Sequence, residues 1–233
     1  MRHAIYFTPD HDDPLTRAGA RWLGRDAFAS GPLCQPVPGG LTADEVARLT
    51  AEPRHYGFHA TLVAPFRLRD GETARGLAAA LEGFCRHRRA VRIPRVVVSR
   101  IGPFFALTPE RPCPRLDELA GELVNQFARF RAPPSPQEIE RRRPGRLTPR
   151  QRQHLDRWGY PYVLDEFRFH MTLTGPTRPA DRERITRALA DWFGPVLGRP
   201  LAISQIAVFV EERPGAPFTF HLSVPLRRQP KVI

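Results

Sequence analysis

One short pattern occurs twice in this chain of 233 residues, first as Phe58-His59-Ala60-Thr61-Leu62 and again as Phe169-His170-Met171-Thr172-Leu173. Each copy places a histidine two residues before a threonine, inside an apolar run that is typical of a buried strand. Side chains alternate between the two faces of a β-strand, so the histidine and the threonine of each copy share one face. The aromatic and aliphatic residues take the other face. They are expected to form core, and the polar face needs a different explanation.

A single His-x-Thr carries little information, because a half-exposed strand with a polar outer side gives the same pattern. With 8 histidines in the chain, one such pair would be unsurprising. Two copies that share the preceding Phe and the following Leu are much harder to obtain by chance. The repetition favours a functional interpretation of His59 and His170 over an ordinary strand.

The segments after the two copies have the same order of expected elements, namely a helix and then two strands. They lie at about 72–88, 91–101 and 104–108 after the first copy, and at about 181–197, 201–210 and 218–224 after the second. This repeat of architecture argues for two similar lobes, each of which contributes one His-x-Thr strand. We expect a single bilobed catalytic domain over residues 1–233. Its lobe one covers about 1–110, a basic helical insertion about 114–160, and lobe two about 161–226.

The N-terminal part carries clear element signals. Residues 4–8 predict a first strand, and Pro14 begins an amphipathic helix to about Leu23. Thr42 and Glu45 have the spacing of a capping box, which starts a short helix to about Leu49. Pro53 is expected to end that unit before the first motif strand.

The insertion is the most basic part of the chain. A helix is expected over about 114–130, followed by a helix-prone stretch and a second helix from Leu147 to Trp158, where Thr148 and Gln151 fit a cap. Its arginines either form a solvated helical face or belong to a flap that brings an arginine to a phosphate. They are Arg141, Arg142, Arg143, Arg146, Arg150, Arg152 and Arg157.

Composition points weakly to an anionic ligand. The formal net charge is +12 and the sequence pI about 11.0, and almost all of the basic residues are arginine, since Lys231 is the one lysine. A small phosphate-containing substrate and nucleic acid both fit this balance, as does a general preference of the source for arginine. The three cysteines have no metal-type spacing. No signal-peptide core or run of about 18 apolar residues occurs, so we expect a cytoplasmic protein without membrane segments. We also expect it to be a monomer.

Two histidines that face each other across a cleft suit paired acid–base chemistry. The pKa of imidazole lies near neutrality, so one ring can accept a proton while the other donates one. Threonine hydroxyls on the same face can donate hydrogen bonds to a phosphate, and arginine can stabilise charge on its oxygens. This scheme requires no metal and no cofactor.

The paired motif resembles the two-histidine (2H) phosphoesterase superfamily, which includes bacterial 2′-5′ RNA ligase-like proteins and cyclic nucleotide phosphodiesterases. Longer runs are more specific: residues 56–62, residues 157–162 and Glu166-Phe167-Arg168-Phe169-His170-Met171-Thr172-Leu173-Thr174-Gly175. They are similar to the DUF1045 branch, also described as a putative phosphonate metabolism protein and found with carbon–phosphorus lyase genes. The similarity covers nearly the whole chain, including the basic insertion.

The resemblance implies an α+β fold with two pseudo-twofold-related lobes, each with an antiparallel sheet and outer helices, and an active site in the cleft between them. It implies metal-independent opening of a ribose cyclic phosphate, in the carbon–phosphorus lyase pathway one that carries a 5-phosphate. His59 and His170 are the implied catalytic pair, and Thr61 and Thr172 hold the phosphate. Arg168, Tyr56 and Tyr6 are further expected substrate-binding residues. Val63 stands where this branch would have a basic residue, so Arg168 or Arg54 could supply that charge.

Several alternatives remain open from the sequence. The enzyme could be an RNA 2′,3′-cyclic phosphodiesterase or a 2′-5′ RNA ligase-like enzyme, or the chain could be a non-enzymatic RNA-binding module. A metal site from His59, His170 and Asp165 is a weaker alternative, since no His-Glu-x-x-His is present. The symmetry of the motifs leaves the acid and the base unassigned.

Overall fold

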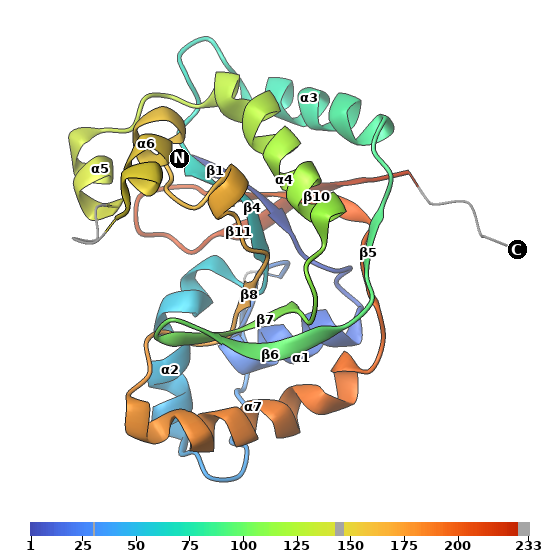
Figure 1. Cartoon of the computed structure of the whole chain (residues 1–233), viewed down its shortest axis with the longest axis vertical. Coiled ribbons are helices and arrows are strands. Elements are labelled where there is room, and N and C mark those ends of the chain that lie inside the picture. The colour runs from blue at the N-terminus through green and yellow to red at the C-terminus, as the bar shows by residue number, and fades with distance from the viewer. Residues whose placement is uncertain (30, 143–146, 228–233) are drawn as a thin grey trace, which may run out of the picture.

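The main element of the fold is an antiparallel sheet in the order β11-β10-β1-β4-β8-β7-β6 (Figure 1). The computed structural model describes residues 1–29, 31–142 and 147–227. The chain has the expected α+β class, with helices on the outer side of each half of the sheet. The strands of this sheet are β1 (Arg2–Phe7), β4 (Ala60–Phe66), β6 (Val96–Ile101), β7 (Phe104–Pro109), β8 (Met171–Thr172), β10 (Gln205–Glu211) and β11 (Thr219–Pro225).

The sheet has two halves, β11-β10-β1-β4 and β8-β7-β6, and the hairpin that follows each motif strand in the sequence lies in the other half. β6 and β7 follow β4 in the chain, yet β7 pairs with β8. β10 and β11 follow β8, yet β10 pairs with β1, which lies beside β4. Each half of the sheet therefore combines strands from both sequence repeats. The division of the sheet does not follow the lobe boundaries expected near residues 110 and 161.

Helices cover the two halves separately. α3 (Ala74–Arg86) contacts β10 and β11, and α4 (Pro114–Phe127) contacts β4. α7 (Arg182–Leu197) contacts β6 and also α1 (Pro14–Leu23), which packs on α2 (Ala43–Tyr56). Figure 1 shows α3 and α4 at one end of the molecule and α1, α2 and α7 at the other. The helix that follows each motif strand thus stays with the half of the sheet that contains that strand.

The expected helix caps are confirmed. In α2 the Glu45 amide donates to Thr42 Oγ1 at 3.2 Å, and the Thr42 amide donates to the Glu45 carboxylate at 2.8 Å. The same reciprocal pair joins Thr148 and Gln151 at the start of α6 (Pro149–Trp158). These bonds satisfy amide groups that have no partner within a helix. α5 (Pro136–Arg142) precedes α6 in the insertion.

The expectation that Pro53 ends α2 is wrong, because the helix continues to Tyr56. A proline inside a helix has no amide hydrogen for the carbonyl four residues earlier. Here that carbonyl belongs to Leu49, and it accepts a hydrogen bond of 2.7 Å from the amide of Gly175 instead. The proline therefore frees an acceptor that ties α2 to the end of the second motif.

Two strands that were expected to be continuous are each divided. The stretch 91–101 forms β5 (Val91–Ile93) and β6, with Pro94 between them, and the stretch 201–210 forms β9 (Leu201–Ile203) and β10. β5 and β9 pair with each other outside the main sheet, with Val91 opposite Ile203. Proline cannot donate to a strand ladder, so at Pro94 the chain passes from the small β5–β9 sheet to β6 of the main sheet.

The alternation along β1 separates two apolar clusters. Ile5 and Phe7 belong to the large core beneath the helices. The opposite face of the same half-sheet carries a smaller buried cluster in which Tyr6 and Phe209 pack over small residues. Its buried members are Ala4, Tyr6, Ala27, Ala207, Phe209 and Phe218. This second, inner face is the one on which His59 lies.

The three cysteines are free thiols; Cys34 is exposed and Cys85 is buried. Within residues 1–29, 31–142 and 147–227, every helix lacks the combination of length and apolar character that a bilayer crossing needs.

Candidate active site

The junction between the two halves of the sheet brings the two motifs together. Ala60 of β4 pairs with Met171 of β8 in antiparallel register. One residue further in each direction, this register places His59 opposite Thr172 and His170 opposite Thr61. Residues directly opposite each other in an antiparallel pair point to the same face. All four polar side chains therefore share one face of the sheet.

These residues line one cavity of about 520 Å³. The structure brings together six of the seven site residues expected from the sequence: His59, His170, Thr61, Thr172, Tyr6 and Tyr56. Arg168 lines a neighbouring cavity of about 400 Å³, whose wall also includes His170 and Thr61. Arg54 lies in neither cavity lining, because its guanidinium donates to the Leu23 carbonyl, Gln35 and Thr50.

Both imidazoles are held in the same way. His59 Nδ1 lies 2.9 Å from the carbonyl oxygen of Gly57, and His170 Nδ1 lies 2.7 Å from that of Arg168. A carbonyl oxygen can only accept, so each Nδ1 carries the proton and each Nε2 presents a lone pair that can accept one. His59 Nε2 accepts a hydrogen bond from Thr61 Oγ1 at 3.1 Å. In both motifs the backbone thus selects the tautomer that leaves Nε2 able to accept a proton.

The turn that presents His59 depends on Gly57. This glycine ends α2 with a φ of 78°, and a Cβ on it would lie 2.7 Å from the Cβ of Ala27. Buried Arg25 holds the same turn, since its guanidinium donates to the last carbonyls of α2 and to one carbonyl next to β11. The acceptors are the carbonyl oxygens of Arg54, His55 and Phe218.

The second motif is anchored through its own backbone. The indole nitrogen of Trp22 donates to the Leu173 carbonyl at 2.8 Å. Thr174 is buried, and its hydroxyl oxygen accepts a 3.0 Å hydrogen bond from the Phe105 amide. Together with the bond between Gly175 and Leu49, these contacts fix the strand that carries His170.

Burial lowers the pKa of both histidines. The ring of Tyr6 stacks on His59 with 3.8 Å between centroids and 23° between planes. Desolvation is the main cause that lowers the pKa of His59 to about 4, and the nearby charges of His170 and Arg25 lower it further. Desolvation also lowers the pKa of His170. Both rings are therefore neutral at pH 7 in the free protein.

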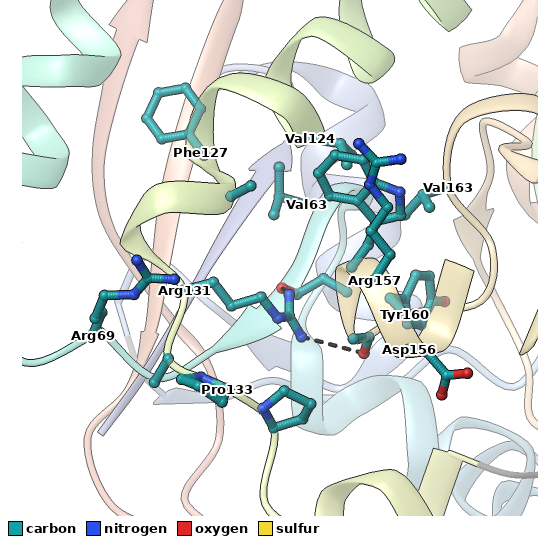
Figure 2. Close-up of a pocket in the computed structure, with 16 residues that line it drawn as sticks. Val63, Arg69, Val124, Phe127, Arg131, Pro133, Asp156, Arg157, Tyr160 and Val163 are labelled. Carbon is teal, nitrogen blue, oxygen red and sulfur yellow. Dashed lines mark hydrogen bonds between the residues drawn. The ribbon is translucent and has the colours of Figure 1, made fainter. Parts of the chain in front are cut away.

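Val63 does not line the His59 cavity. The register of β4 against β1 shifts between Thr61 and Val63, so strict alternation fails there and Ala64 takes a place in the cavity wall. Val63 instead lines a separate pocket of about 240 Å³ beside α4 (Figure 2). Arg131 lies in that pocket and donates to the Gly159 carbonyl at 3.3 Å.

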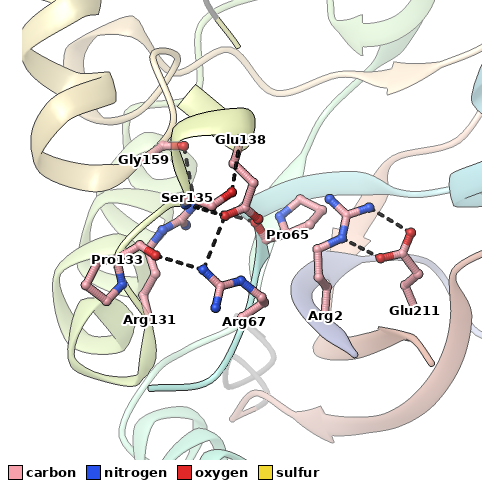
Figure 3. Close-up of polar contacts among 9 residues, drawn as sticks. All are labelled: Arg2, Pro65, Arg67, Arg131, Pro133, Ser135, Glu138, Gly159 and Glu211. Carbon is pink, nitrogen blue, oxygen red and sulfur yellow. Dashed lines mark hydrogen bonds and ion pairs between the residues drawn. The ribbon is translucent and has the colours of Figure 1, made fainter. Parts of the chain in front are cut away.

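Several residues that line the cavity are not among those expected from the sequence. Arg2 lines it and pairs with Glu211 of β10, as Figure 3 shows. The signal was present, because Arg2 has the same parity as Tyr6, but the first strand was expected to begin at Ala4. Tyr160 and Phe104 also line the cavity and arrive through tertiary contacts that no local pattern predicts.

The basic insertion contributes in a limited way. Arg150 forms an ion pair with Asp165 at 2.8 Å, and His154 also contacts this carboxylate. The Arg157 guanidinium lies over the Trp158 ring. Arg143 and Arg146 lie outside the described residues. Tyr160, which follows α6, is the insertion residue that reaches the His59 cavity.

The alternative metal site is not assembled. Asp165 is engaged by Arg150 and His154 and is not in the lining of the cavity that contains both motif histidines. Among the residues that the structure describes, no three His, Cys, Asp or Glu residues are grouped so as to hold a metal ion.

An α+β fold with two facing His-x-Thr strands defines a paired-histidine site. Residues 61–219 match the family described as "Protein of unknown function (DUF1045)". The chain belongs to this family.

A curated protein from Janthinobacterium sp. (strain Marseille), named ribose 1,5-bisphosphate phosphokinase PhnN, is 38% identical over 232 residues, which are 98% of this chain and 51% of that protein. Its namesake from Laribacter hongkongensis (strain HLHK9) is 33% identical over 218 residues, or 94% of this chain and 50% of that protein. The chain spans about half the length of these curated relatives.

Two solved structures match nearly the whole chain at low sequence identity. TT0787 of Thermus thermophilus is 14% identical with a TM-score of 0.47, covering 98% of this chain and 100% of that chain. E. coli LigT complexed with 3′-AMP is 14% identical with a TM-score of 0.42, covering 97% of this chain and 98% of that chain. These identities are too low to transfer a function.

Proposed function

We propose that this protein is a metal-independent phosphoric diester hydrolase that opens a ribose cyclic phosphate by paired histidine acid–base catalysis. One observation carries the proposal: two His-x-Thr motifs from distant parts of the chain line one cavity in opposed register. Each histidine is held through Nδ1, which leaves Nε2 for proton transfer. That arrangement supplies one acceptor and, after protonation, one donor on the same phosphorus centre.

The proposed reaction is a hydrolysis in which one P–O bond forms and one breaks. Nε2 of the basic histidine takes a proton from water while the water oxygen attacks phosphorus. Nε2 of the acidic histidine gives a proton to the departing ribose oxygen. When the substrate binds, the Thr61 hydroxyl turns from His59 Nε2 to a non-bridging oxygen, and Thr172 donates to a non-bridging oxygen as well. Negative charge accumulates on these oxygens in the transition state. Product release and one proton exchange with solvent restore the starting state.

The environments of the two rings favour His59 as the base and His170 as the acid. His59 is covered by Tyr6, and its pKa is lowered to about 4, with charge on His170 among the causes. The first proton taken up by the pair therefore goes preferentially to His170. An anionic phosphate between the rings favours that uptake, because it stabilises the imidazolium.

The substrate we propose is a ribose 1,2-cyclic phosphate that carries a 5-phosphate. The curated relatives are named for a kinase of ribose 1,5-bisphosphate, and this chain corresponds to about half of their length. Breaking the bond between phosphorus and the 2-oxygen of such a cyclic ester yields ribose 1,5-bisphosphate. Hydrolysis of the proposed substrate would therefore supply ribose 1,5-bisphosphate, the compound that appears in the relatives' name. This agrees with the resemblance to phosphonate-metabolism proteins.

The remaining expected residues have proposed binding roles. Tyr6 and Tyr56 lie in the wall of the cavity at the sugar position. One face of the sugar can pack on the half-buried Tyr56, whereas the buried Tyr6 ring is stacked on His59 and offers its edge. Arg168 lies beside His170 in the neighbouring cavity and adds positive potential at that end of the site.

We further propose that the protein acts as a cytoplasmic monomer with one bilobed catalytic domain. Both histidines come from one chain, so a second copy is not needed to complete the site. Light scattering of the purified protein tests its monomeric state.

The function is tested with a panel of purified substrates in the presence of EDTA. We expect turnover of ribose 1,2-cyclic phosphate 5-phosphate, and a fall in kcat/KM of about 100- to 10,000-fold in His59→Ala and in His170→Ala. His221→Ala changes an exposed histidine on β11 and is the matched control. Near-normal rates in either motif variant would reject the paired mechanism.

The panel also tests the RNA alternatives. The basic composition, with a formal net charge of +12, favours them. An RNA cyclic phosphodiesterase predicts turnover of RNA ends with 2′,3′-cyclic phosphates and binding that weakens steeply with salt. A non-enzymatic RNA-binding module predicts RNA binding that survives loss of both histidines.

A further inference from the structure

Arg2 is held in an unusual way at the wall of the His59 cavity. Arg2 and Glu211 are directly opposite in the antiparallel pair of β1 and β10, and the Arg2 Nε and Nη2 groups both donate to the carboxylate (Figure 3). The Glu211 side chain is only 1% exposed, and it also accepts a hydrogen bond from the Gly215 amide at 3.1 Å. A bidentate pair with a buried carboxylate fixes the plane of the guanidinium.

A second contact fixes the other side of the same group. The Cζ atom of Arg2 lies 5.4 Å from the centre of the Phe218 ring, a cation–π contact. With Nε and Nη2 turned to Glu211, the remaining nitrogen, Nη1, is directed to the side of Pro65 in Figure 3. Pro65 lines the same cavity as Arg2. The donors of Nη1 are therefore available on the cavity side.

The position of Arg2 relates it directly to the histidine pair. Arg2, Ala4 and Tyr6 alternate along β1 on the inner face, and Tyr6 stacks on His59. Four residues of strand correspond to about 13 Å between the Cα atoms of Arg2 and Tyr6. The pKa of Arg2 is raised, mainly by its hydrogen bond to Glu211 and in smaller part by Tyr56 and Tyr6. Tyr6 and Tyr56 thus lie near Arg2 and also beside His59, so the two phenols connect Arg2 with the histidine pair.

We propose that Arg2 binds a second, remote phosphate of the substrate, so that the site selects ribose cyclic phosphates with a phosphate on the 5-oxygen. This inference rests on the proposed function, since it assumes that the cyclic phosphate lies between the two histidines. Arg2 is the one arginine that lines this cavity among the residues described. Arg25 and Arg54 are engaged by backbone carbonyls and other buried acceptors, and Arg168 lies in the neighbouring cavity.

The paired carboxylate determines how Arg2 works. Glu211 offsets part of the positive charge, but it also prevents the side chain from adopting other conformations, so less entropy is lost when the phosphate binds. Nη1 keeps two N–H donors in a fixed plane, and charge-assisted hydrogen bonds of this kind to phosphate oxygens are strong. A substrate with a single cyclic phosphate would leave Arg2 Nη1 without a phosphate oxygen, although Arg2 keeps its pair with Glu211. Arg2 therefore makes the protein bind a 5-phosphorylated ribose cyclic phosphate more tightly than the same compound without its 5-phosphate.

The first test compares kcat/KM for ribose 1,2-cyclic phosphate with and without its 5-phosphate. We expect the intact protein to favour the 5-phosphorylated form, and Arg2→Gln to reduce that preference about 10- to 100-fold, mostly through KM. Arg2→Lys should restore part of it. Arg187→Gln is the matched control, because Arg187 is an exposed arginine of α7 paired with Glu183. An unchanged preference in a folded Arg2→Gln protein would overturn the proposal.

A binding measurement separates this proposal from the proposed reaction. Ribose 5-phosphate carries only the remote phosphate, and its affinity can be measured by calorimetry without turnover. We expect Arg2→Gln to weaken its binding about tenfold or more, whereas the affinity for ribose itself barely differs between the two proteins. Equal binding of ribose 5-phosphate by both proteins refutes the role of Arg2. Retained turnover in His59→Ala instead refutes the proposed reaction and leaves this binding result standing. Circular dichroism of Arg2→Gln confirms that Glu211, left without its partner, has not unfolded the sheet.

Discussion

The phenol ring of Tyr6 lies on the imidazole of His59, with 3.8 Å between ring centroids. This contact connects the first strand of the protein to its first motif. It covers one face of the histidine and excludes water from it. A neutral imidazole is more stable in such an environment than a charged one, so the contact favours the neutral form of His59 in the free protein.

The pKa of His59 should rise toward its ordinary value of 6.5 when Tyr6 is replaced by Ala. Desolvation is the main cause of the lowered pKa, which is about 4, and removal of the phenol ring admits water. NMR titration of the His59 ring measures the change directly. Phe209→Leu is a useful comparison, because the Phe209 ring lies farther from His59, at 6.2 Å. A His59 pKa that stays near 4 in Tyr6→Ala would contradict the role of this contact.

Protein stability should fall as the pH decreases from about 6.5 to about 4. The unfolded chain takes up a proton on His59 near its ordinary pKa of 6.5, whereas the folded chain does so only near 4. Between these values the unfolded state binds more protons, so the free energy of unfolding decreases with falling pH. Urea unfolding at several pH values measures this slope. The difference between intact protein and His59→Ala isolates the contribution of His59.

Thr172 of β8 and Thr174, two residues after it, both line the cavity but should respond differently to replacement by Val. Thr172 is half-buried and is proposed to bind the phosphate through its hydroxyl, so Thr172→Val should lower kcat by about 10- to 100-fold with little change in stability. Thr174 is buried and accepts the Phe105 amide. Thr174→Val leaves that amide unpaired and should lower the free energy of unfolding by about 1–3 kcal/mol. Measuring kcat and denaturant midpoints for both variants tests the contrast, and an exchange of the two effects would refute the assignment.

Gly57→Ala should both destabilise the protein and reduce its activity. Gly57 has a φ of 78°, and an added Cβ would lie 2.7 Å from the Cβ of Ala27. We expect a loss of about 1–3 kcal/mol, and a fall in kcat because the Gly57 carbonyl orients His59. Gly83→Ala in α3 is the control, since nothing lies within 4 Å of its added Cβ. That change should stabilise the helix by about 0.4–1 kcal/mol.

Pro53→Ala should loosen the connection between α2 and the second motif. The new amide at position 53 can bond the Leu49 carbonyl within the helix and so competes with Gly175. Hydrogen exchange of the Gly175 amide should become at least about tenfold faster if this competition succeeds. Pro195→Ala, at another proline inside a helix, should leave Gly175 unaffected. Unchanged protection of Gly175 in Pro53→Ala would mean that its bond does not depend on the proline.

Chelation should leave activity intact. The proposed mechanism uses imidazole and hydroxyl groups alone, and Asp165, the third ligand of the alternative site, is paired with Arg150. We expect kcat to be unchanged after dialysis against EDTA. Loss of activity that is restored by a divalent metal would favour a metal-dependent mechanism instead.

Local patterns in the sequence were sufficient to predict most helices and the faces of the motif strands. The spacing of apolar residues and the capping boxes at Thr42 and Thr148 located most helices, because these signals act within one or two turns. Period-two alternation assigned His59 and Thr61 to one face for the same reason. The sequence failed at Pro53, where a tertiary hydrogen bond to Gly175 compensates for the missing amide. It failed also at Pro94, where the chain moves from one sheet to another.

By itself, the sequence determined that two matching polar strands exist and which side chains share a face, since both follow from covalent geometry and short-range periodicity. Tertiary structure alone decided that Ala60 pairs with Met171, which sets the two motifs opposite each other, and that the hairpins after each motif are exchanged between the halves of the sheet. It also decided that Arg2 meets Glu211 at the cavity wall. The physical reason is that strand partners more than 100 residues apart are selected by packing and hydrogen bonding over the whole fold, and no local preference of the chain encodes that choice.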